Sequence, residues 1–221
     1  MNILDFDGII FDMDGTLLDS LGIWVQSDIT FITEQGFEYD SAVSAELKKM
    51  HFSSACEYLK QRYSLEMSET EIGERIMELV RKSYLTEAEL KPFVYDFVSG
   101  LHQKGVKMCV ATSNEKGLAE GALKNTGIYP MMRFVITSDE VGEGKETPKI
   151  FLEAAKKLGT APERTLVFED SLHALVSAKN GEFYTIGVYE ERFADEFELL
   201  KKEAQITIRS FGELTLGEDT L

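Results

Sequence analysis

The sequence predicts an α/β fold in which helices cover a mostly parallel sheet, and three observations support this prediction. Short apolar segments of strand length alternate along the chain with amphipathic segments of helical period. Glycines such as Gly105 and Gly159 stand where the amphipathic segments should end, as glycines that terminate helices do. The interval 18–89 breaks this alternation and shows only helical periodicity, which indicates a helical domain inserted after the first strand.

The elements outside the insert follow from their apolar patterns. The predicted strands are short apolar runs of the kind buried in parallel sheets: Ile9–Phe11, Lys107–Ala111, Arg133–Ile136, Thr165–Phe168 and Tyr184–Val188. The predicted helices each carry one apolar face: Val94–Lys104, Lys116–Asn125, Pro148–Leu158, Leu172–Asn180 and Ala194–Lys202. Since helices that alternate with strands connect them in parallel, residues 1–17 and 90–221 are predicted to form a three-layer sandwich.

The insert, residues 18–89, is predicted to be a small all-helical domain. Its apolar residues follow a helical period, as at Trp24 and Phe31. Ser68 and Glu71 have the Ser-x-x-Glu spacing of a capping box, which indicates that another helix begins there.

Composition and charge exclude several classes of partner. The 221 residues carry 23 Lys and Arg against 39 Asp and Glu, a net charge of −16, which argues against nucleic acids and anionic membranes as partners. No apolar stretch is long enough to span a bilayer, and no basic region followed by an apolar stretch marks a secretory signal. Cys56 and Cys109 are too few for a disulfide framework, so a cytoplasmic location is expected.

The first predicted strand ends on two acids, Asp12 and Asp14, followed by Gly15 and Thr16. Two carboxylates at the carboxyl end of a buried strand are costly unless a cation lies between them. Mg²⁺ prefers carboxylate oxygen and is the obvious candidate. The alternative for this segment alone is a surface corner between a strand and a turn, where Asp, Gly and Thr are common.

The next two predicted strands are followed by groups that suit an anion. Thr112, Ser113 and Asn114 lead into a helix, whose N-terminus can hold anionic oxygens together with these side chains. The loop Thr137–Lys149 is predicted to be mobile and contains Lys145. Taken alone, Thr112 is better explained as a cap of the next helix, and Lys145 as a solvated surface charge.

A second acidic pair, Glu169 and Asp170, follows the fourth predicted strand, although it could also serve as a cap for the next helix. Ligands of open α/β sheets collect at the carboxyl ends of the strands. The joint arrival of acids, hydroxyls and a lysine at successive strand ends therefore predicts a site for a metal ion and a phosphate. Of the histidines, His102 and His173 are expected on exposed helix surfaces, and His51 is retained as a candidate substrate contact.

The order of these motifs resembles the haloacid dehalogenase superfamily over essentially the whole chain. The matching residues are Asp12-Met-Asp14-Gly-Thr16, then Thr112, then Lys145 with Pro148 downstream, then Glu169-Asp170-Ser171. The helical insert is similar to the α-helical cap of the branch that holds β-phosphoglucomutase and phosphoglycolate phosphatase. The resemblance implies a Rossmann-like core with an inserted cap domain.

The resemblance also implies roles for the acids. Asp12 would be the nucleophile that forms an aspartyl-phosphate, and Asp14 the general acid for the leaving oxygen and then the general base for water. Mg²⁺ would bind Asp12, the backbone carbonyl of Asp14 and Asp170, with Glu169 bound directly or through water.

The remaining matched residues would serve the phosphoryl group. Thr112 would bond a phosphoryl oxygen, and Lys145 would neutralise the charge of the nucleophile and the phosphoryl group. The residues Gly15, Thr16, Ser113 and Asn114 are expected to contribute to phosphate or substrate binding, and Gly15 and Thr16 to begin the hinge to the cap.

The presence of Asp14 favours phosphoester chemistry, because dehalogenases as a group lack an acid there. Mutases of this branch hold a second phosphate with a cap arginine, and the corresponding stretch Lys49–Ser53 has none. A Mg²⁺-dependent phosphatase of a small phosphorylated metabolite, acting as a monomer, is therefore expected. The alternatives are a phosphosugar mutase, a non-catalytic binding protein of the same fold, and a response-regulator receiver domain, which would be shorter and lack the insert.

Overall fold

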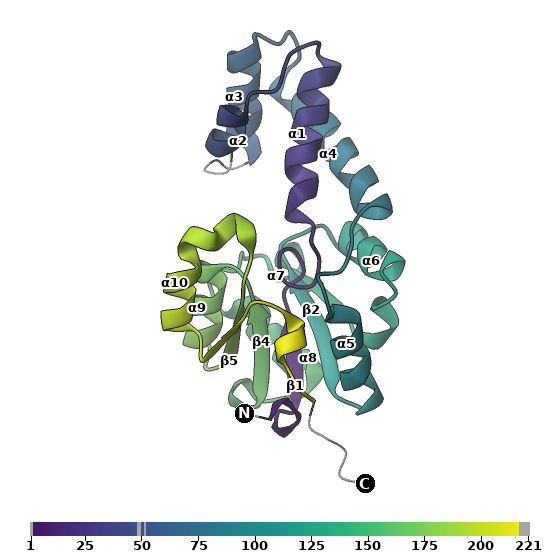
Figure 1. Cartoon of the computed structure of the whole chain (residues 1–221), viewed down its shortest axis with the longest axis vertical. Helices are drawn as coiled ribbons and strands as arrows, with labels where there is room; N and C mark the ends of the chain where they lie inside the picture. The colour runs from purple at the N-terminus through teal and green to yellow at the C-terminus, as the bar shows by residue number, and fades with distance from the viewer. Residues whose placement is uncertain (1, 48–49, 51, 217–221) are drawn as a thin grey trace. The chain divides into compact units, whose positions relative to one another are not determined.

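The computed structural model describes residues 2–47, 50 and 52–216, and the chain divides into two compact units (Figure 1). Unit 1 comprises Met1–Asp19 and Ala88–Leu221, and unit 2 comprises Ser20–Glu87. Among the helices of the described residues, none combines the length and apolarity that a bilayer crossing requires.

Unit 1 is built on a six-stranded sheet of order β3-β2-β1-β4-β5-β6, in which all neighbouring strands are parallel. The strands are β1 (Gly8–Phe11), β2 (Lys107–Thr112), β3 (Val135–Thr137), β4 (Thr165–Glu169), β5 (Tyr184–Val188) and β6 (Ile206–Ile208). The register of the central strands pairs Phe11 with both Val110 and Phe168. The predicted parallel α/β sheet is confirmed.

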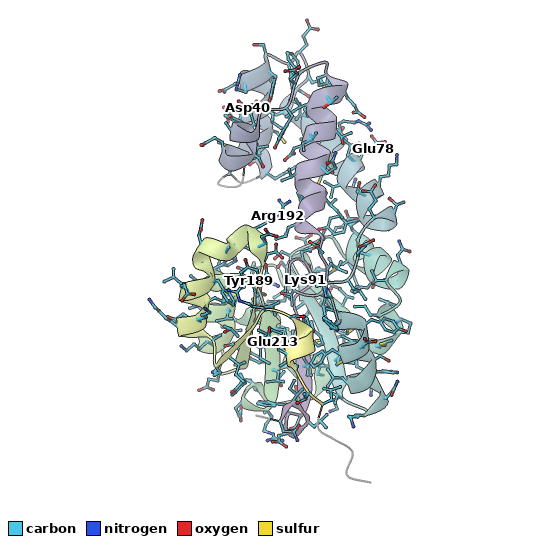
Figure 2. All side chains as sticks on the ribbon, in the orientation of Figure 1. Asp40, Glu78, Lys91, Tyr189, Arg192 and Glu213 are labelled. Carbon is cyan, nitrogen blue, oxygen red and sulfur yellow. The ribbon has the colours of Figure 1, made fainter. Side chains whose placement is uncertain are left out.

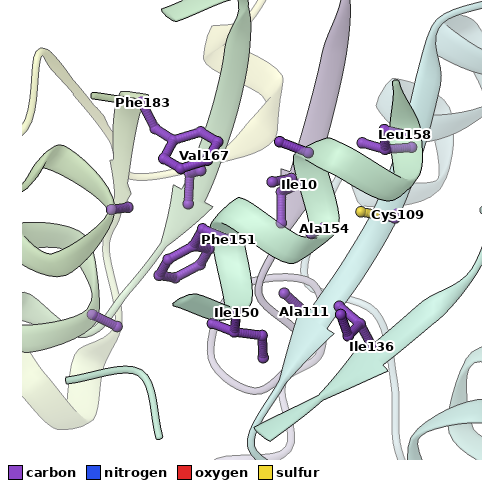
Figure 3. Packing of buried hydrophobic residues seen from close by; sticks show 13 residues of the cluster. Ile10, Cys109, Ala111, Ile136, Ile150, Phe151, Ala154, Leu158, Val167 and Phe183 are labelled. Atoms are coloured by element: carbon purple, nitrogen blue, oxygen red, sulfur yellow. The ribbon is translucent and has the colours of Figure 1, made fainter. Parts of the chain in front are cut away.

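Helices cover both faces of this sheet. They are α5 (Val94–Gln103), α6 (Lys116–Asn125), α7 (Ser138–Val141), α8 (Lys149–Leu158), α9 (Leu172–Asn180) and α10 (Phe197–Glu203). On one face, Ile10 and Val167 pack against Phe151 of α8 (Figure 3). On the other, Phe11 and Phe168 contact an aromatic cluster with Phe97 of α5 and Phe211. Successive residues of a strand point to opposite faces, so both layers draw on the same short strands.

Several elements differ from the sequence prediction, among them β3, the loop after it and the helix after β5. The strand predicted from Arg133 is assigned from Val135, although the Arg133 N–H already bonds the Met108 carbonyl at 2.7 Å. The helix predicted over Ala194–Lys202 is divided in the structure between α10 and a preceding 3-10 helix, Glu191–Glu196, whose backbone is kinked at Phe193. The predicted loop after β3 contains α7, which begins with a capping box between Thr137 and Glu140.

All the regular secondary structure in the described residues of unit 2 is helical, as predicted for the insert. It contains α1 (Leu21–Glu34), α2 (Ser41–Leu47), α3 (Phe52–Tyr63) and α4 (Glu69–Thr86). Helix α4 packs against both α1 and α3 and contributes Ile72, Ile76 and Tyr84 to a buried core. The predicted capping box of Ser68 and Glu71 is present, with the Ser68 N–H donating to Glu71 Oε2 at 2.8 Å. His51 lies outside the described residues.

Asp28 on α1 is a carboxyl whose replacement is expected to stabilise the protein. Burial raises the pKa of Asp28 to about 7. A carboxyl with a raised folded-state pKa favours folding when protonated, and this contribution is lost as pH rises from about 4 through 7. The advantage of Asp28→Asn over wild type should therefore grow from about pH 5.5 to pH 8, reaching about 1–3 kcal/mol in the free energy of unfolding.

Thermal and urea unfolding at both pH values measure this difference. Glu66→Gln, which removes an exposed carboxyl of the same unit, is the matched control and should leave stability nearly unchanged. An Asp28→Asn variant less stable than wild type at about pH 8 would contradict the assignment of a destabilising buried charge.

Candidate active site

Asp12 directly follows β1, and its backbone continues the pairing of β1 with β4. Its backbone N–H donates to the Phe168 carbonyl at 2.9 Å, and its side chain is buried. Because Phe11 pairs with Phe168, the next residues of the two strands, Asp12 and Glu169, stand side by side. The sheet register thus brings together two acids that are 157 positions apart in the chain, counted from 12 to 169.

Asp14 is aimed separately by the turn that follows. Gly15 has a φ of 84°, in the left-handed region that glycine adopts without strain, and its N–H bonds the Leu18 carbonyl at 2.9 Å. This turn leaves Asp14 partly exposed, and Asn114 Nδ2 lies 3.4 Å from Asp14 Oδ2. Asp14 is therefore the acid of the pair that solvent can reach.

Lys145 joins the two strand ends through its ammonium group. Lys145 Nζ donates to Asp12 Oδ1 and, at 2.9 Å, to Glu169 Oε2, and all three side chains are buried. Burial lowers the pKa of Lys145, but the attraction of the two carboxylates outweighs it and raises the pKa overall. Lys145 is therefore a permanent cation at this position.

The site holds more buried carboxyl groups than positive charges, since Asp12, Glu169 and Asp170 lie around Lys145, the single cation among the described residues that line their pocket. Burial, followed by the charge of Asp12, raises the pKa of Glu169 to about 7, although Lys145 opposes the shift. Burial, together with the charges of Asp12 and Glu169, also raises the pKa of Asp170 well above its ordinary value. The site therefore has too little positive charge for its carboxylates at neutral pH.

The three buried acids have the arrangement of metal ligands. Asp12, Glu169 and Asp170 each offer a carboxylate oxygen within 4.8 Å of the others. Asp12 Oδ2 is buried and makes no hydrogen bond within the described part of the chain. Carboxylate oxygen is the donor that hard divalent cations prefer, so this group fits such an ion both in chemistry and in charge.

The hydroxyl and amide groups predicted for the end of β2 lie at the same site. Thr112 is buried, and its Oγ1 accepts a hydrogen bond from the Asn114 N–H at 3.0 Å. Ser113 is exposed, and its Oγ lies 3.2 Å from Ser138 Oγ. These three residues form a polar corner beside the acids.

Thr16 and Gly15 are next to the acids in the chain and are engaged in hydrogen bonds with other residues. The Thr16 hydroxyl is fully buried and donates to Asp170 Oδ1 at 3.2 Å. The Gly15 carbonyl accepts a hydrogen bond from Lys91 Nζ at 2.7 Å. In this structure both residues contact other parts of the site, and neither lines the pocket described next.

A pocket of about 170 Å³ collects most of the predicted residues. Its lining consists of Asp12, Asp14, Thr112, Ser113, Lys145, Glu169, Asp170, Ser171, His173, Ala174 and Phe193. His173 is exposed on α9 as expected, but that helix begins two residues after Asp170, so its first turn borders the pocket. Phe193 was not identified from the sequence, because nothing in the chain marks the turn that follows β5.

Comparison with known proteins places the chain in a family. Residues 9–188 match the model of the haloacid dehalogenase-like hydrolases. Fructose-1-phosphate phosphatase YqaB of Escherichia coli K12 is 27% identical over 174 residues, covering 79% of this chain and 92% of that one. The phosphorylated carbohydrates phosphatase of Thermotoga maritima is 23% identical over 174 residues, covering 79% and 81%.

Solved structures show the same fold. A haloacid dehalogenase family hydrolase from Deinococcus radiodurans R1, with bound phosphate and sodium, superposes with a TM-score of 0.76 at 22% identity and covers 95% of this chain and 93% of that one. β-Phosphoglucomutase from Clostridium difficile gives a TM-score of 0.71 at 19% identity, with the same coverage of 95% and 93%. The resemblance drawn from the motifs is thus confirmed, and the chain belongs to the haloacid dehalogenase-like hydrolases.

Proposed function

We propose that the protein is a Mg²⁺-dependent phosphatase that hydrolyses a small phosphorylated metabolite through an aspartyl-phosphate. The observation that carries this proposal is the buried Asp12 carboxylate, which lines the pocket with one oxygen bonded to Lys145 and the other without a partner among the described residues. Such an oxygen is free to attack phosphorus, while the bonded one is held in place.

The relatives support phosphate esters of carbohydrates as the substrate class. One is named for fructose 1-phosphate and another for phosphorylated carbohydrates. The net charge of −16 would repel such an anion at a distance, so positive charge must be supplied within the site itself. Lys145 provides part of it.

The metal ion would be held by Asp12, Glu169 and Asp170, with the backbone carbonyl of Asp14 as a further ligand. When bound, Mg²⁺ would offset the charge of these carboxylates and of the phosphoryl oxygens. Thr16 would hold Asp170 in its orientation through the hydrogen bond between their side chains.

The first chemical step belongs to Asp12 and Asp14. Asp12 would attack phosphorus, so that an Asp12 oxygen–phosphorus bond forms as the bond to the leaving alcohol oxygen breaks. Asp14, protonated at this stage, would give its proton to that oxygen. The Thr112 hydroxyl and Lys145 would stabilise the charge on the phosphoryl oxygens.

In the second step the same groups would work in reverse. Asp14, now a carboxylate, would take a proton from a water molecule that attacks phosphorus. The bond to Asp12 would break, which restores the Asp12 carboxylate and releases inorganic phosphate. We propose that unit 2 acts as the cap that excludes bulk water during the first step.

Phosphate release with and without metal tests this proposal. p-Nitrophenyl phosphate and a panel of sugar phosphates, phosphoglycolate and nucleotides should be hydrolysed in Mg²⁺ and lose at least about 100-fold in rate in EDTA. No hydrolysis of any ester would favour a non-catalytic binding protein. Interconversion of glucose 1- and 6-phosphates without phosphate release would favour the mutase, whose fold this chain shares.

The raised pKa of Glu169 predicts how Mg²⁺ affects stability. A carboxyl with a folded-state pKa of about 7 contributes to stability when protonated, and the contribution is lost as pH rises from its ordinary value of 4.5 through 7. Metal ligands must be deprotonated to bind. The rise in thermal midpoint on adding Mg²⁺ should therefore be larger at about pH 8 than at about pH 5.5.

Thermal unfolding in EDTA and in Mg²⁺ at the two pH values measures this effect. Asp170→Asn, which removes one proposed ligand, should lose most of the Mg²⁺-dependent rise. A rise that is equal at both pH values, or that survives in Asp170→Asn, would contradict the proposed metal site.

A further inference from the structure

Among the pocket side chains that have no role in the proposed reaction are a phenylalanine and a histidine. Phe193, in the 3-10 helix after β5, is 38% exposed and lines the pocket together with Asp12 and Asp14. His173, in the first turn of α9, lines the same pocket. Both belong to unit 1, so the pocket wall that they form does not depend on the other unit.

A partly buried ion pair lies at the start of the 3-10 helix that carries Phe193. Glu190 is 7% exposed, and its Oε1 accepts a hydrogen bond from the Arg192 N–H at 3.2 Å, which caps the 3-10 helix. Its Oε2 accepts a bond from Lys91 Nζ at 2.8 Å. This fixes the start of the short helix that carries Phe193.

The same lysine ties this helix to the turn that carries Asp14. Lys91 Nζ also donates to the carbonyls of Gly15 at 2.7 Å and Tyr189 at 2.8 Å. Lys91, Tyr189 and Arg192 are labelled in Figure 2, where Lys91 and Tyr189 lie at the same level of unit 1. A single ammonium group therefore bonds both the turn that follows Asp14 and the residues that precede the 3-10 helix carrying Phe193.

His173 offers one ring nitrogen to a ligand. Its Nδ1 lies 2.6 Å from Ser171 Oγ, and Nε2 has no hydrogen bond within the described part of the chain. His173 also borders an adjoining cavity of about 520 Å³, which shares Ser113 and Lys145 with the first pocket. The His173 imidazole thus lines both the proposed phosphoryl-binding pocket and the larger cavity next to it.

The size of the first pocket indicates where the rest of a substrate lies. Sites that enclose a whole small molecule measure roughly 300–1,000 Å³. At about 170 Å³, this pocket has room for a phosphoryl group and little else. The alcohol part of an ester bound there must therefore pass the side chains at the pocket wall.

We propose that Phe193 and His173 form a subsite for the alcohol of a carbohydrate-type phosphate ester, an inference that rests on the proposed phosphatase function. The Phe193 ring would pack against the C–H face of the sugar. His173 Nε2 would exchange a hydrogen bond with a sugar hydroxyl, which can donate or accept and so pairs with either tautomer. Specificity for the sugar would then reside partly in unit 1.

Two substrates that share the phosphoryl group, one attached to a sugar and one without a sugar, test this subsite. The variants are Phe193→Ala and His173→Ala, with Leu199→Ala as the control that truncates an exposed apolar side chain outside the pocket. In each variant, the ratio of kcat/KM for fructose 1-phosphate to that for acetyl phosphate should fall about 3- to 10-fold, mainly through KM. In Leu199→Ala the ratio should stay at the wild-type value.

A binding measurement separates this inference from the proposed reaction. Calorimetric titrations in Mg²⁺, with the Asp12→Asn substitution added to every protein to prevent turnover, use fructose 1-phosphate and inorganic phosphate as ligands. They should show the same 3- to 10-fold loss, for the sugar ester alone, in both variants. Absence of hydrolysis in wild type would count against the phosphatase, while the titration would still decide the subsite. Equal losses for both ligands, or no loss for either, would overturn the subsite.

Discussion

Asp12→Asn is expected to lower kcat for phosphate-ester hydrolysis by at least about 10⁴-fold. The neutral amide is a poor nucleophile, and the neighbouring Glu169 carboxylate is held by bonds to Lys145 and to the Ser171 N–H and is not placed to replace it. The substitution preserves shape and removes one charge from a crowded group of acids. The folded structure should therefore persist.

Steady-state hydrolysis of p-nitrophenyl phosphate measures the loss, and thermal unfolding checks that the variant is folded. Asp19→Asn is the matched control, since it changes an exposed aspartate near the same turn. Turnover within about 10-fold of wild type in a folded Asp12→Asn protein would remove Asp12 as the nucleophile.

Asp14→Asn is expected to produce the second largest effect, a loss of about 10²- to 10⁴-fold in kcat/KM for a sugar phosphate. A sugar alkoxide is a poor leaving group and needs the proton that Asp14 supplies. Nitrophenolate needs none, so the loss in kcat/KM for p-nitrophenyl phosphate should be much smaller. The contrast arises because kcat/KM reports the step in which the leaving group departs.

Parallel measurement with the two esters tests this role. The informative quantity is the ratio of the two losses in Asp14→Asn. Equal losses would show that Asp14 acts by holding structure or metal and would contradict general acid catalysis. Asn114→Ala is a useful companion and should have a modest effect, since it removes the 3.4 Å contact to Asp14 and the hydrogen bond that Asn114 Oδ1 accepts from the Glu115 N–H at 2.9 Å.

The central sheet could be predicted because its strands are buried on both faces. Four strands, β1, β2, β4 and β5, consist mainly of consecutive apolar residues. Such runs can be recognised as buried strands even when the neighbouring strands are not known. β6, Ile206–Ile208, was missed because it is a three-residue edge strand with a half-buried Ile-Thr-Ile pattern. Such a segment becomes a strand because it pairs with β5, and this pairing cannot be recognised from the local sequence.

The sequence of the loop after β3 contains a helix-capping signal that predicts the start of α7. Thr137 and Glu140 have capping-box spacing, and the structure begins α7 there. By contrast, the 3-10 helix that is kinked at Phe193 begins after Glu190, a capping residue that also forms an ion pair with Lys91. That contact joins residues 99 positions apart, so no local pattern could reveal it.

The candidate site was predictable where chemistry demands particular residue types at strand ends. Asp12, Lys145, Glu169 and Asp170 were named from the motifs, and the structure brings them together. Phe193 carries no such signal, since a phenylalanine is ordinarily assigned to a core. The pocket wall could be identified only once the end of β5 was placed beside the acids.

The most direct test of the account is a crystal structure with Mg²⁺ and beryllofluoride, which mimics a phosphoryl group on a carboxylate. We expect beryllium bonded to Asp12, the metal on Asp12 and Asp170, and fluorides near Thr112 and Lys145. Beryllofluoride on another residue, or a metal ion bound away from Asp12, would contradict it.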